Sequence, residues 1–323
     1  MRLRGPVIGG LAAIGLVAAI FVAVDQGLGP FPDPEVCVAE VDGHKVELSL
    51  EQAENAALIS AIAVRRGLPA RAASIALATA YQESKIENIE HGDRDSLGLF
   101  QQRPSQGWGT EQEILDPYYS TNAFYDALVE IDGYEKMRIT EAAQKVQRSA
   151  FPEAYEDHAE DGRALASALT GHSQDGAFSC EVRSTPDEES AELDAAGLTA
   201  RAAAVRDDLE AAYGDLSLGG FSPEGVDSGH MEGSAHYEGR AIDVFVRPIN
   251  EANQVKGWSM AYYLVAQADR LGIQHVIFDG KIWTSGRRSK DGWRDYSPDT
   301  SGRTAEQAAI LEHRDHVHVD VFP

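Results

Sequence analysis

Cysteine and positive charge are both scarce in this chain. Its 323 residues contain two cysteines, and 28 Lys and Arg stand against 52 Asp and Glu, a formal net charge of -24. So few cysteines exclude a disulfide-scaffold fold. Such a charge repels a phosphate backbone, and no basic stripe interleaved with aromatics occurs, so we expect no nucleic-acid partner. Hydrophobic residues, at 43%, are numerous enough to fill the cores of two domains.

The longest hydrophobic run extends from Val7 to Val24 and follows two arginines. As a helix it is about 27 Å long, which is close to the hydrocarbon thickness of a bilayer and longer than the usual core of a signal peptide. Residues 1–25 are therefore predicted to be a cytoplasmic tip and a single-pass membrane anchor, with the arginines inside and the body outside the cell membrane. A cleaved signal peptide, which releases a secreted body, stays open as the alternative.

The two cysteines, Cys37 and Cys180, flank the first large block of the chain. In an oxidising compartment they most simply pair with each other, which ties the ends of that block together. Two unpaired buried thiols are the alternative.

The composition divides the body into four parts. A Pro-rich stalk at 26–47 precedes a mostly α-helical domain at 48–180. Within that domain Ser49 and Gln52 form a capping box, Gly67 stops the first helix, and Pro69 begins a second one that runs to about Gln82.

The stretch 181–197 carries six acids and almost no bulky apolar residue, so we expect a solvated linker. In 198–323 a helix capped by Thr199 is followed by short runs with strand character, AIDVFV, HVIF, KIW and HVHVDVF, and by one more helix near 259–271. The predicted fold class is thus multidomain, with a mostly α domain followed by an α+β domain.

Two of these strands alternate branched apolar residues with polar ones. In AIDVFVR the alternation puts Asp243 opposite the branched side chains, and in HVHVDVF it puts His316 and His318 opposite the valines. If the two strands pair, Asp243 comes near His318, and His236 can return to the same point. Two imidazoles and one carboxylate form a catalytic zinc set with a fourth position left for water.

These segments, SAHYEGRAID and later HVHVDV, resemble the zinc peptidase superfamily of D-alanyl-D-alanine carboxypeptidases, lysostaphin-type endopeptidases and the hedgehog signalling domain. The similarity covers roughly 198–323, and hedgehog shares a histidine six residues before the first ligand, here His230. The resemblance implies an α+β zinc-peptidase-like domain, and it assigns the residues of its site as follows: Zn²⁺ held by His236, Asp243 and His318, a substrate contact at Arg240, and His316 as the neighbour that polarises the water or the scissile carbonyl.

Two carboxylates compete for the role of general base. The carboxypeptidases place an acid three residues before the last ligand, which is Asp315 here, whereas hedgehog places a glutamate six before it, here Glu312. Aspartate is one methylene shorter than the usual glutamate. The resemblance favours Asp315 narrowly and leaves Glu312 open.

The helical domain contains a second cluster, AYQESKIEN followed by DSLGLFQQRP. Glu83 falls at the predicted end of an apolar helix, where a carboxyl is half buried, a setting suited to a general acid. E-S followed by G-L-F-Q resembles the soluble lytic transglycosylases and goose-type lysozymes over about 50–175. That resemblance implies a lysozyme-like domain that cuts between N-acetylmuramic acid and N-acetylglucosamine, with Glu83 as acid/base and Ser84 and Gln101 in the substrate groove. Hydrolytic and lytic cleavage both stay open.

Both resemblances concern bonds of one polymer, bacterial peptidoglycan. The sequence therefore predicts a membrane-anchored, bifunctional peptidoglycan hydrolase. The alternative is a component that binds the wall or belongs to an envelope machine, with one or both domains inactive. Protein partners, the oligomeric state and the peptide bond that is cut are left open.

Overall fold

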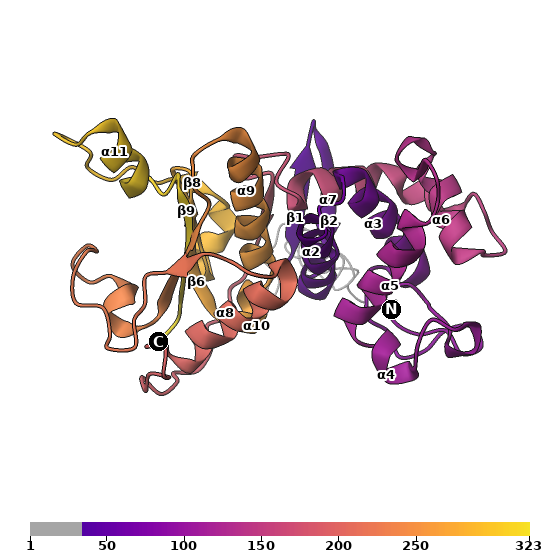
Figure 1. The fold of residues 1–323 in the computed structure, drawn as a ribbon, viewed down its shortest axis with the longest axis horizontal. Helices are drawn as coiled ribbons and strands as arrows, with labels where there is room; N and C mark the ends of the chain where they lie inside the picture. The colour runs from indigo at the N-terminus through magenta and orange to yellow at the C-terminus, as the bar shows by residue number, and fades with distance from the viewer. Residues whose placement is uncertain (1–33) are drawn as a thin grey trace, which may run out of the picture. The chain divides into compact units, whose positions relative to one another are not determined.

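The computed structural model describes residues 34–323 (Figure 1). The predicted anchor at 1–25 and the first part of the stalk lie outside the described residues. Within the described chain, no helix has both the length and the apolar character needed to cross a membrane. Residues 36–323 pack as one unit that contains both helices and sheets.

A small antiparallel sheet joins the two ends of the predicted helical domain. Its strands are β1 (Cys37–Val41), β2 (His44–Leu48) and β3 (Phe178–Cys180), in the order β2-β1-β3. Cys37 lies directly opposite Cys180 in the register, and the two sulfurs form a disulfide 2.02 Å long. The predicted pairing is confirmed.

Removing this disulfide is expected to lower the free energy of unfolding by roughly 2–5 kcal/mol, because the bridge restricts the unfolded chain over a long loop. Its two cysteines are 143 residues apart in the sequence. We suggest comparing the double variant Cys37→Ala/Cys180→Ala with the parent by urea unfolding. An unchanged transition midpoint would contradict a stabilising role.

The segment between β2 and β3 is helical, as predicted. Helix α2 (Leu50–Arg65) begins at the predicted capping box, where Ser49 Oγ accepts a hydrogen bond from the backbone N–H of Gln52 at 3.2 Å. The other helices of this segment are α3 (Ala70–Ser84), α4 (Glu111–Ile114), α5 (Pro117–Val129), α6 (Ile139–Gln147) and α7 (Ala159–Leu169).

Helix α3 is rich in alanine, which allows α7 to approach it closely. A Cβ added to Gly162 of α7 would lie 2.7 Å from the carbonyl oxygen of Ser74, so only glycine fits there. The helix ends before Lys85, which adopts a left-handed conformation with φ +60°. Glu83 therefore lies on the last turn of an apolar helix, where the sequence placed it.

The C-terminal segment forms an antiparallel sheet of six strands, in the order β4-β5-β9-β6-β7-β8. The strands are β4 (Leu218–Gly219), β5 (Ala241–Phe245), β6 (Ile273–Phe278), β7 (Lys281–Thr284), β8 (Arg294–Asp295) and β9 (His316–Val321). The helices are α8 (Ala200–Tyr213), α9 (Glu251–Ala266), α10 (Ala268–Leu271) and α11 (Ala305–Leu311). This agrees with the predicted α+β pattern.

The two faces of this sheet differ, as the alternation predicted. Ile242 and Val244 of β5 and Val317 and Val319 of β9 are buried in the core, on the side that α8 and α9 contact. In the register of these two strands Asp243 lies opposite His318. The polar side chains of both strands consequently share the other face.

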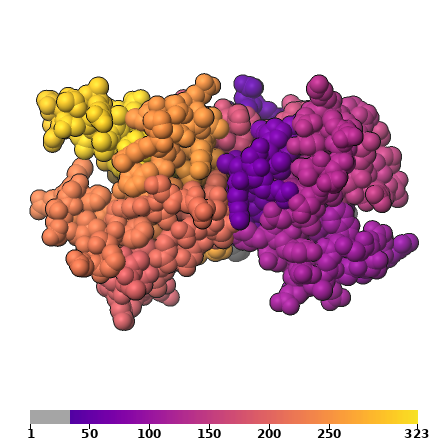
Figure 2. All heavy atoms as spheres, viewed as in Figure 1, coloured from indigo at the N-terminus to yellow at the C-terminus, as the bar shows by residue number. Residues whose placement is uncertain are grey.

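One hydrophobic core runs through the helical and C-terminal segments. Ser259 Oγ in α9 donates to the carbonyl oxygen of Leu169 in α7 at 2.8 Å, and Trp283 Nε1 donates to that of Cys180 at 3.1 Å. In Figure 2 the indigo atoms of α2 lie against the orange atoms of α9, in agreement with their contacts. The predicted linker is exposed from 184 to 195, but it spans segments that share a core.

Candidate metal centre and candidate acid site

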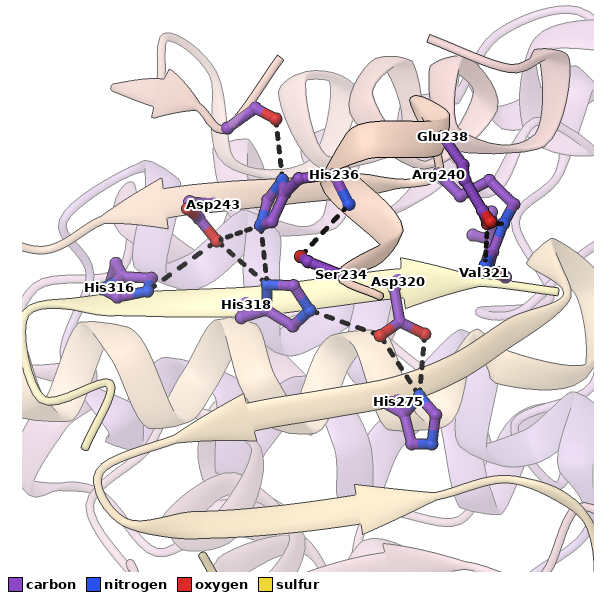
Figure 3. A network of polar contacts seen from close by, with 11 residues as sticks. Ser234, His236, Glu238, Arg240, Asp243, His275, His316, His318, Asp320 and Val321 are labelled. Atoms are coloured by element: carbon purple, nitrogen blue, oxygen red, sulfur yellow. Dashed lines mark hydrogen bonds and ion pairs between the residues drawn. The ribbon is translucent and has the colours of Figure 1, made fainter. Parts of the chain in front are cut away.

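Three side chains that the sequence put forward as metal ligands are neighbours. His236 lies in the short 3-10 helix η4 (Ala235–Glu238), Asp243 in β5 and His318 in β9. Nε2 of His236 is 3.1 Å from Nδ1 of His318 and 3.3 Å from Oδ1 of Asp243, and Nδ1 of His318 is 3.0 Å from the same oxygen (Figure 3). All three residues are buried.

Each imidazole has one nitrogen that points toward the other ligands and one that points away from them. The hydrogen bond of the outer nitrogen determines which of the two carries the proton in the neutral ring. Nδ1 of His236 donates to the carbonyl oxygen of Gly220 at 2.7 Å, so Nε2 carries the lone pair of the neutral ring. Nε2 of His318 donates to Asp320 at 3.3 Å, so Nδ1 carries its lone pair. Two lone pairs and a carboxylate oxygen then face one another, an arrangement that a cation stabilises.

The size and chemistry of this cluster fit a zinc ion. Zn²⁺ binds imidazole nitrogen and carboxylate oxygen at about 2.0–2.2 Å, and tetrahedral ligands at such distances lie roughly 3.3–3.6 Å from one another. The three separations between the ligand atoms are 3.1, 3.3 and 3.0 Å. Asp320 also accepts a hydrogen bond from Nδ1 of His275 at 2.9 Å, which fixes the carboxylate that orients His318.

The charges in the cluster shift each other's protonation. Burial opposes ionisation of Asp243, but hydrogen bonds with His236 and His318 outweigh it and hold the pKa of Asp243 well below its usual range. Burial likewise opposes a charge on His318, yet its hydrogen bonds to Asp243 and Asp320 raise the pKa of His318 to about 9. Without a metal the ring is therefore charged at pH 7, and a bound cation would take the place of the proton on Nδ1. The pocket is therefore built to hold positive charge beside two carboxylates.

His316 borders the cluster and is itself held by a carboxylate. Its Nδ1 is 2.7 Å from Oδ1 of Asp315, and its Nε2 is 3.8 Å from Oδ1 of Asp243. The second oxygen of Asp315 accepts from Nε of Arg247 at 2.6 Å. Burial would raise the pKa of Asp315, but these hydrogen bonds from His316 and Arg247 lower it. Both carboxylate oxygens of Asp315 are thus engaged in orienting its neighbours.

The other residues put forward from the sequence lie outside this cluster. Glu312, which follows α11, accepts a hydrogen bond from Arg314 at 2.7 Å. Arg240 donates to Glu238 and to the carbonyl oxygen of Val321, and in Figure 3 this group lies at the other end of β9 from the three ligands. The structure thus gives Arg240 a contact that joins η4 to the end of the sheet.

Two further histidines lie at the centre. The ring of His230 stacks on His236 at 3.9 Å between centroids, and ligand atoms of His230, His236 and Asp243 lie within 4.8 Å of one another. The sequence signal for His230 was its place six residues before His236. His230 is thus available as a further ligand.

His313 was missed by the sequence reasoning. Its ring lies 4.6 Å from that of His316 and 5.6 Å from that of His318, measured between centroids. Burial, together with the two neighbouring imidazoles, lowers the pKa of His313 to about 3, so the ring is neutral at pH 7. Its place two residues before Asp315, in a turn with φ +55°, follows no strand alternation that would have revealed it.

Gly220→Ala is expected to weaken metal binding by at least tenfold. The added Cβ would lie 2.3 Å from Cε1 of His236 and 2.6 Å from its Nδ1, so the imidazole must move away from the other ligands. Loss of the group that holds a metal-binding histidine from behind costs roughly 10–100-fold in metal affinity. The measurement is a competition titration with a zinc chelator.

Gly225→Ala is the matched control for this variant. Gly225 has φ +80° against +79° for Gly220, but a Cβ there meets nothing within 4 Å. Both variants therefore carry the same backbone strain, and equal metal affinities in the two would show that the contact with His236 is unimportant.

In the helical segment, Glu83 accepts a hydrogen bond from the buried hydroxyl of Tyr155 at 2.6 Å. Tyr155 lies in the 3-10 helix η3 (Ala154–His158), and the sequence reasoning did not find it because 72 residues separate the two. Its contact fixes one oxygen of the carboxyl and leaves the other available.

Ser84 and Gln101, the predicted groove residues, lie in the same region. Ser84 is buried, and its hydroxyl donates to the carbonyl oxygen of Leu99 at 2.8 Å, which ties the end of α3 to the GLFQ turn. Gln101 has φ +47°, and its amide donates to the carbonyl oxygens of His91 and Gly98. The two motifs of this cluster are therefore directly connected.

Asp95, a carboxylate that precedes the GLFQ turn, has no contact with Glu83 among the described residues. Asp95 accepts hydrogen bonds from Nε of Arg103 at 2.6 Å and from the backbone N–H of Ser105 at 2.8 Å. Hydrogen bonds from Ser105 and Arg103 hold the pKa of Asp95 well below its usual range. These hydrogen bonds of Asp95 therefore hold the loop after the GLFQ turn in place.

Comparison with known protein families gives one finding. Residues 194–308 match the family described as VldE, C-terminal domain. The match covers less than half of the chain, and it includes His236 and Asp243 but ends before His318. A comparison with curated proteins finds no match. What the chain does must therefore be argued from the two sites.

Proposed function

We propose that this chain is a bifunctional peptidoglycan hydrolase, anchored in the cell membrane, that cuts peptides at a zinc centre and glycan strands at Glu83. The observation that carries the proposal is the set of three ligand atoms of His236, Asp243 and His318, 3.0–3.3 Å apart, with both imidazole tautomers fixed from behind. A structural zinc site would more often recruit cysteines, and both cysteines are used in the disulfide.

The residues around the metal centre suit hydrolysis of an amide. Zinc, when bound, lowers the pKa of a coordinated water to about 7 and polarises a carbonyl. His316, oriented by Asp315, is the group we assign to take up the proton of the attacking water, since its Nε2 faces the ligand Asp243 at 3.8 Å. Asp315 then stabilises the resulting imidazolium, a role that fits its two hydrogen bonds better than direct proton uptake does.

The helical segment supplies the second activity. Glu83 is the acid that protonates the oxygen leaving the glycosidic bond, and Tyr155 holds its carboxyl in one orientation. Asp95 is already bound by Arg103 and by the backbone N–H of Ser105, so it is not free to act as a second catalytic carboxylate. This favours a reaction that needs one carboxylate, as in the lytic transglycosylases that the ES and GLFQ motifs resemble.

A common substrate and compartment support combining the two activities. Peptidoglycan contains both kinds of bond, and a disulfide between Cys37 and Cys180 suits the oxidising side of a membrane. The proposal rests on the sites, since the fold alone does not determine function.

Digestion of purified peptidoglycan by the intact protein tests this proposal. We expect mass analysis to find shortened glycan strands and released peptides, and a zinc chelator to remove the peptide products while the glycan products remain. Intact peptidoglycan after incubation with zinc-loaded protein would overturn it and favour a module that only binds the wall.

A further inference from the structure

A cross-strand row leads from the metal ligands to the opposite edge of the sheet. Each residue of the row lies opposite the next in the strand register, so all of them share the face of the metal centre. The row consists of Gly219, Asp243, His318, Ile277, Ile282 and Arg294. Arg294 is three strands away from His318, which is about 14 Å at the usual strand spacing.

A cavity of about 740 Å³ occupies this end of the row. His275, whose imidazole is bonded to Asp320 behind the ligand His318, lines it on the side of the metal centre. Its floor includes Ile282 and Thr284 of β7, and three arginines border it: Arg288, Arg294 and Arg303. The cavity therefore lies on the same face of the sheet as the metal centre, and the hydrogen bonds of Asp320 with His275 and with His318 link the two.

The arginines have capacity for an anion. Arg294 lines the cavity, and Nη2 of its guanidinium donates to Oγ1 of Thr284 at 2.7 Å, while its other terminal nitrogen, Nη1, forms no hydrogen bond with residues 34–323. Of the two acids in the cavity wall, Asp295 is paired with Lys281 at 2.9 Å and Asp299 accepts from the backbone N–H of Ser301. The chain as a whole has a net charge of -24, so a cavity that is bordered by three arginines has a charge opposite to that of most of the protein.

We propose that this cavity binds a free carboxylate of the peptide substrate, with Arg294 as its main partner. The inference rests on the proposed peptidase function and deepens it, because it makes a negative charge near the cleaved bond a requirement for good substrates. An extended peptide advances about 3.3–3.6 Å per residue, so a span of about 14 Å places the carboxylate up to about four residues from that bond. Guanidinium groups bind carboxylates through paired hydrogen bonds, which a neutral amide cannot replace.

Binding of matched peptides tests the assignment. The probes are alanine pentapeptides, blocked at both ends, with one glutamate at each position in turn, their glutamine counterparts, and an alanine pentapeptide with a free C-terminal carboxylate. Titration calorimetry on the zinc-loaded intact protein is expected to give at least tenfold tighter binding for one of the carboxylate peptides than for its neutral counterpart. The last peptide distinguishes a terminal carboxylate from a side-chain one.

Arg294→Gln is expected to abolish this preference, and Arg294→Lys, which retains the charge, to keep part of it. Arg287→Gln is the control, because Arg287 is exposed and does not border the cavity. If Arg294→Gln does not fold, Arg288→Gln, at the exposed rim, gives the same comparison with a smaller loss. Equal binding of carboxylate and neutral peptides by the parent protein, or a full preference in both variants, would overturn the proposal.

Measuring both peptide binding and peptide cleavage distinguishes a failure of this inference from a failure of the proposed function. A carboxylate preference in a protein that cuts no peptide would refute the peptidase activity and leave the anion site standing. Cleavage of charged and neutral peptides at equal rates would refute the anion site and leave the peptidase standing.

Discussion

Replacing His318 with alanine is expected to remove the bound zinc and reduce peptide hydrolysis by more than 100-fold. His318 is one of the three proposed protein ligands and is the hydrogen-bond partner of both Asp243 and Asp320. Loss of a group that only orients a ligand already costs roughly 10–100-fold in metal affinity or activity, so loss of the ligand itself must cost more. Zinc content by elemental analysis and release of peptides from peptidoglycan are the two measurements.

The His318→Ala variant also removes one hydrogen-bond partner from each of two buried carboxylates, Asp243 and Asp320, so part of its effect is on stability. Asp243→Asn keeps the shape of the side chain and removes one charge, and it should lose zinc with a smaller change in unfolding. His172→Ala is the control, since His172 is exposed and far along the chain from the ligands. Parent levels of zinc in both His318→Ala and Asp243→Asn would remove the basis for the metal centre.

Replacing Glu83 with glutamine is expected to reduce glycan cleavage by roughly 10²–10⁴-fold, the usual contribution of a general acid or base. Glutamine has nearly the same shape, and its carbonyl oxygen can still accept the hydrogen bond from Tyr155, so the fold should not change. The measurement is the rate at which purified peptidoglycan releases glycan fragments, with peptide release as an internal check.

Glu87→Gln is the matched control for the glycan site, because Glu87 follows the same helix but has no contact with Tyr155 among the described residues. Peptide release should be the same in the parent and in Glu83→Gln, since the metal centre is built from a different part of the chain. Glycan cleavage by Glu83→Gln at the rate of the parent would exclude Glu83 as the acid.

Several features of this protein follow from short stretches of its sequence. The capping box at Ser49 and Gln52, the stop at Gly67 and the start at Pro69 concern only local hydrogen bonds and backbone sterics, so the start of α2, the turn after it and the start of α3 were predictable. Strand alternation depends only on a period of two, and it assigned Asp243 and His318 to the polar face. The cysteine pair was predictable because two cysteines allow one pairing.

Other features depend on which strands become neighbours. The order β5-β9-β6 brings His275 behind the ligand His318, and a loop before β5 brings the carbonyl of Gly220 to His236, although nothing in the local pattern relates these residues. The contact between Glu83 and Tyr155 has the same origin in helix packing.

Local patterns were thus sufficient to predict the main helix starts, the strand face that carries Asp243 and His318, and the disulfide. The hydrogen bond behind His236, the contact of Asp315 with Arg247 and the arginine-lined cavity arise only when separate segments of the chain pack together. The physical reason is that propensity and periodicity act between near neighbours in the chain. Pairing of distant strands depends instead on burying all the valines of β5 and β9 on one face of the sheet. Because side chains alternate along a strand, that burial also determines which polar side chains meet on the other face.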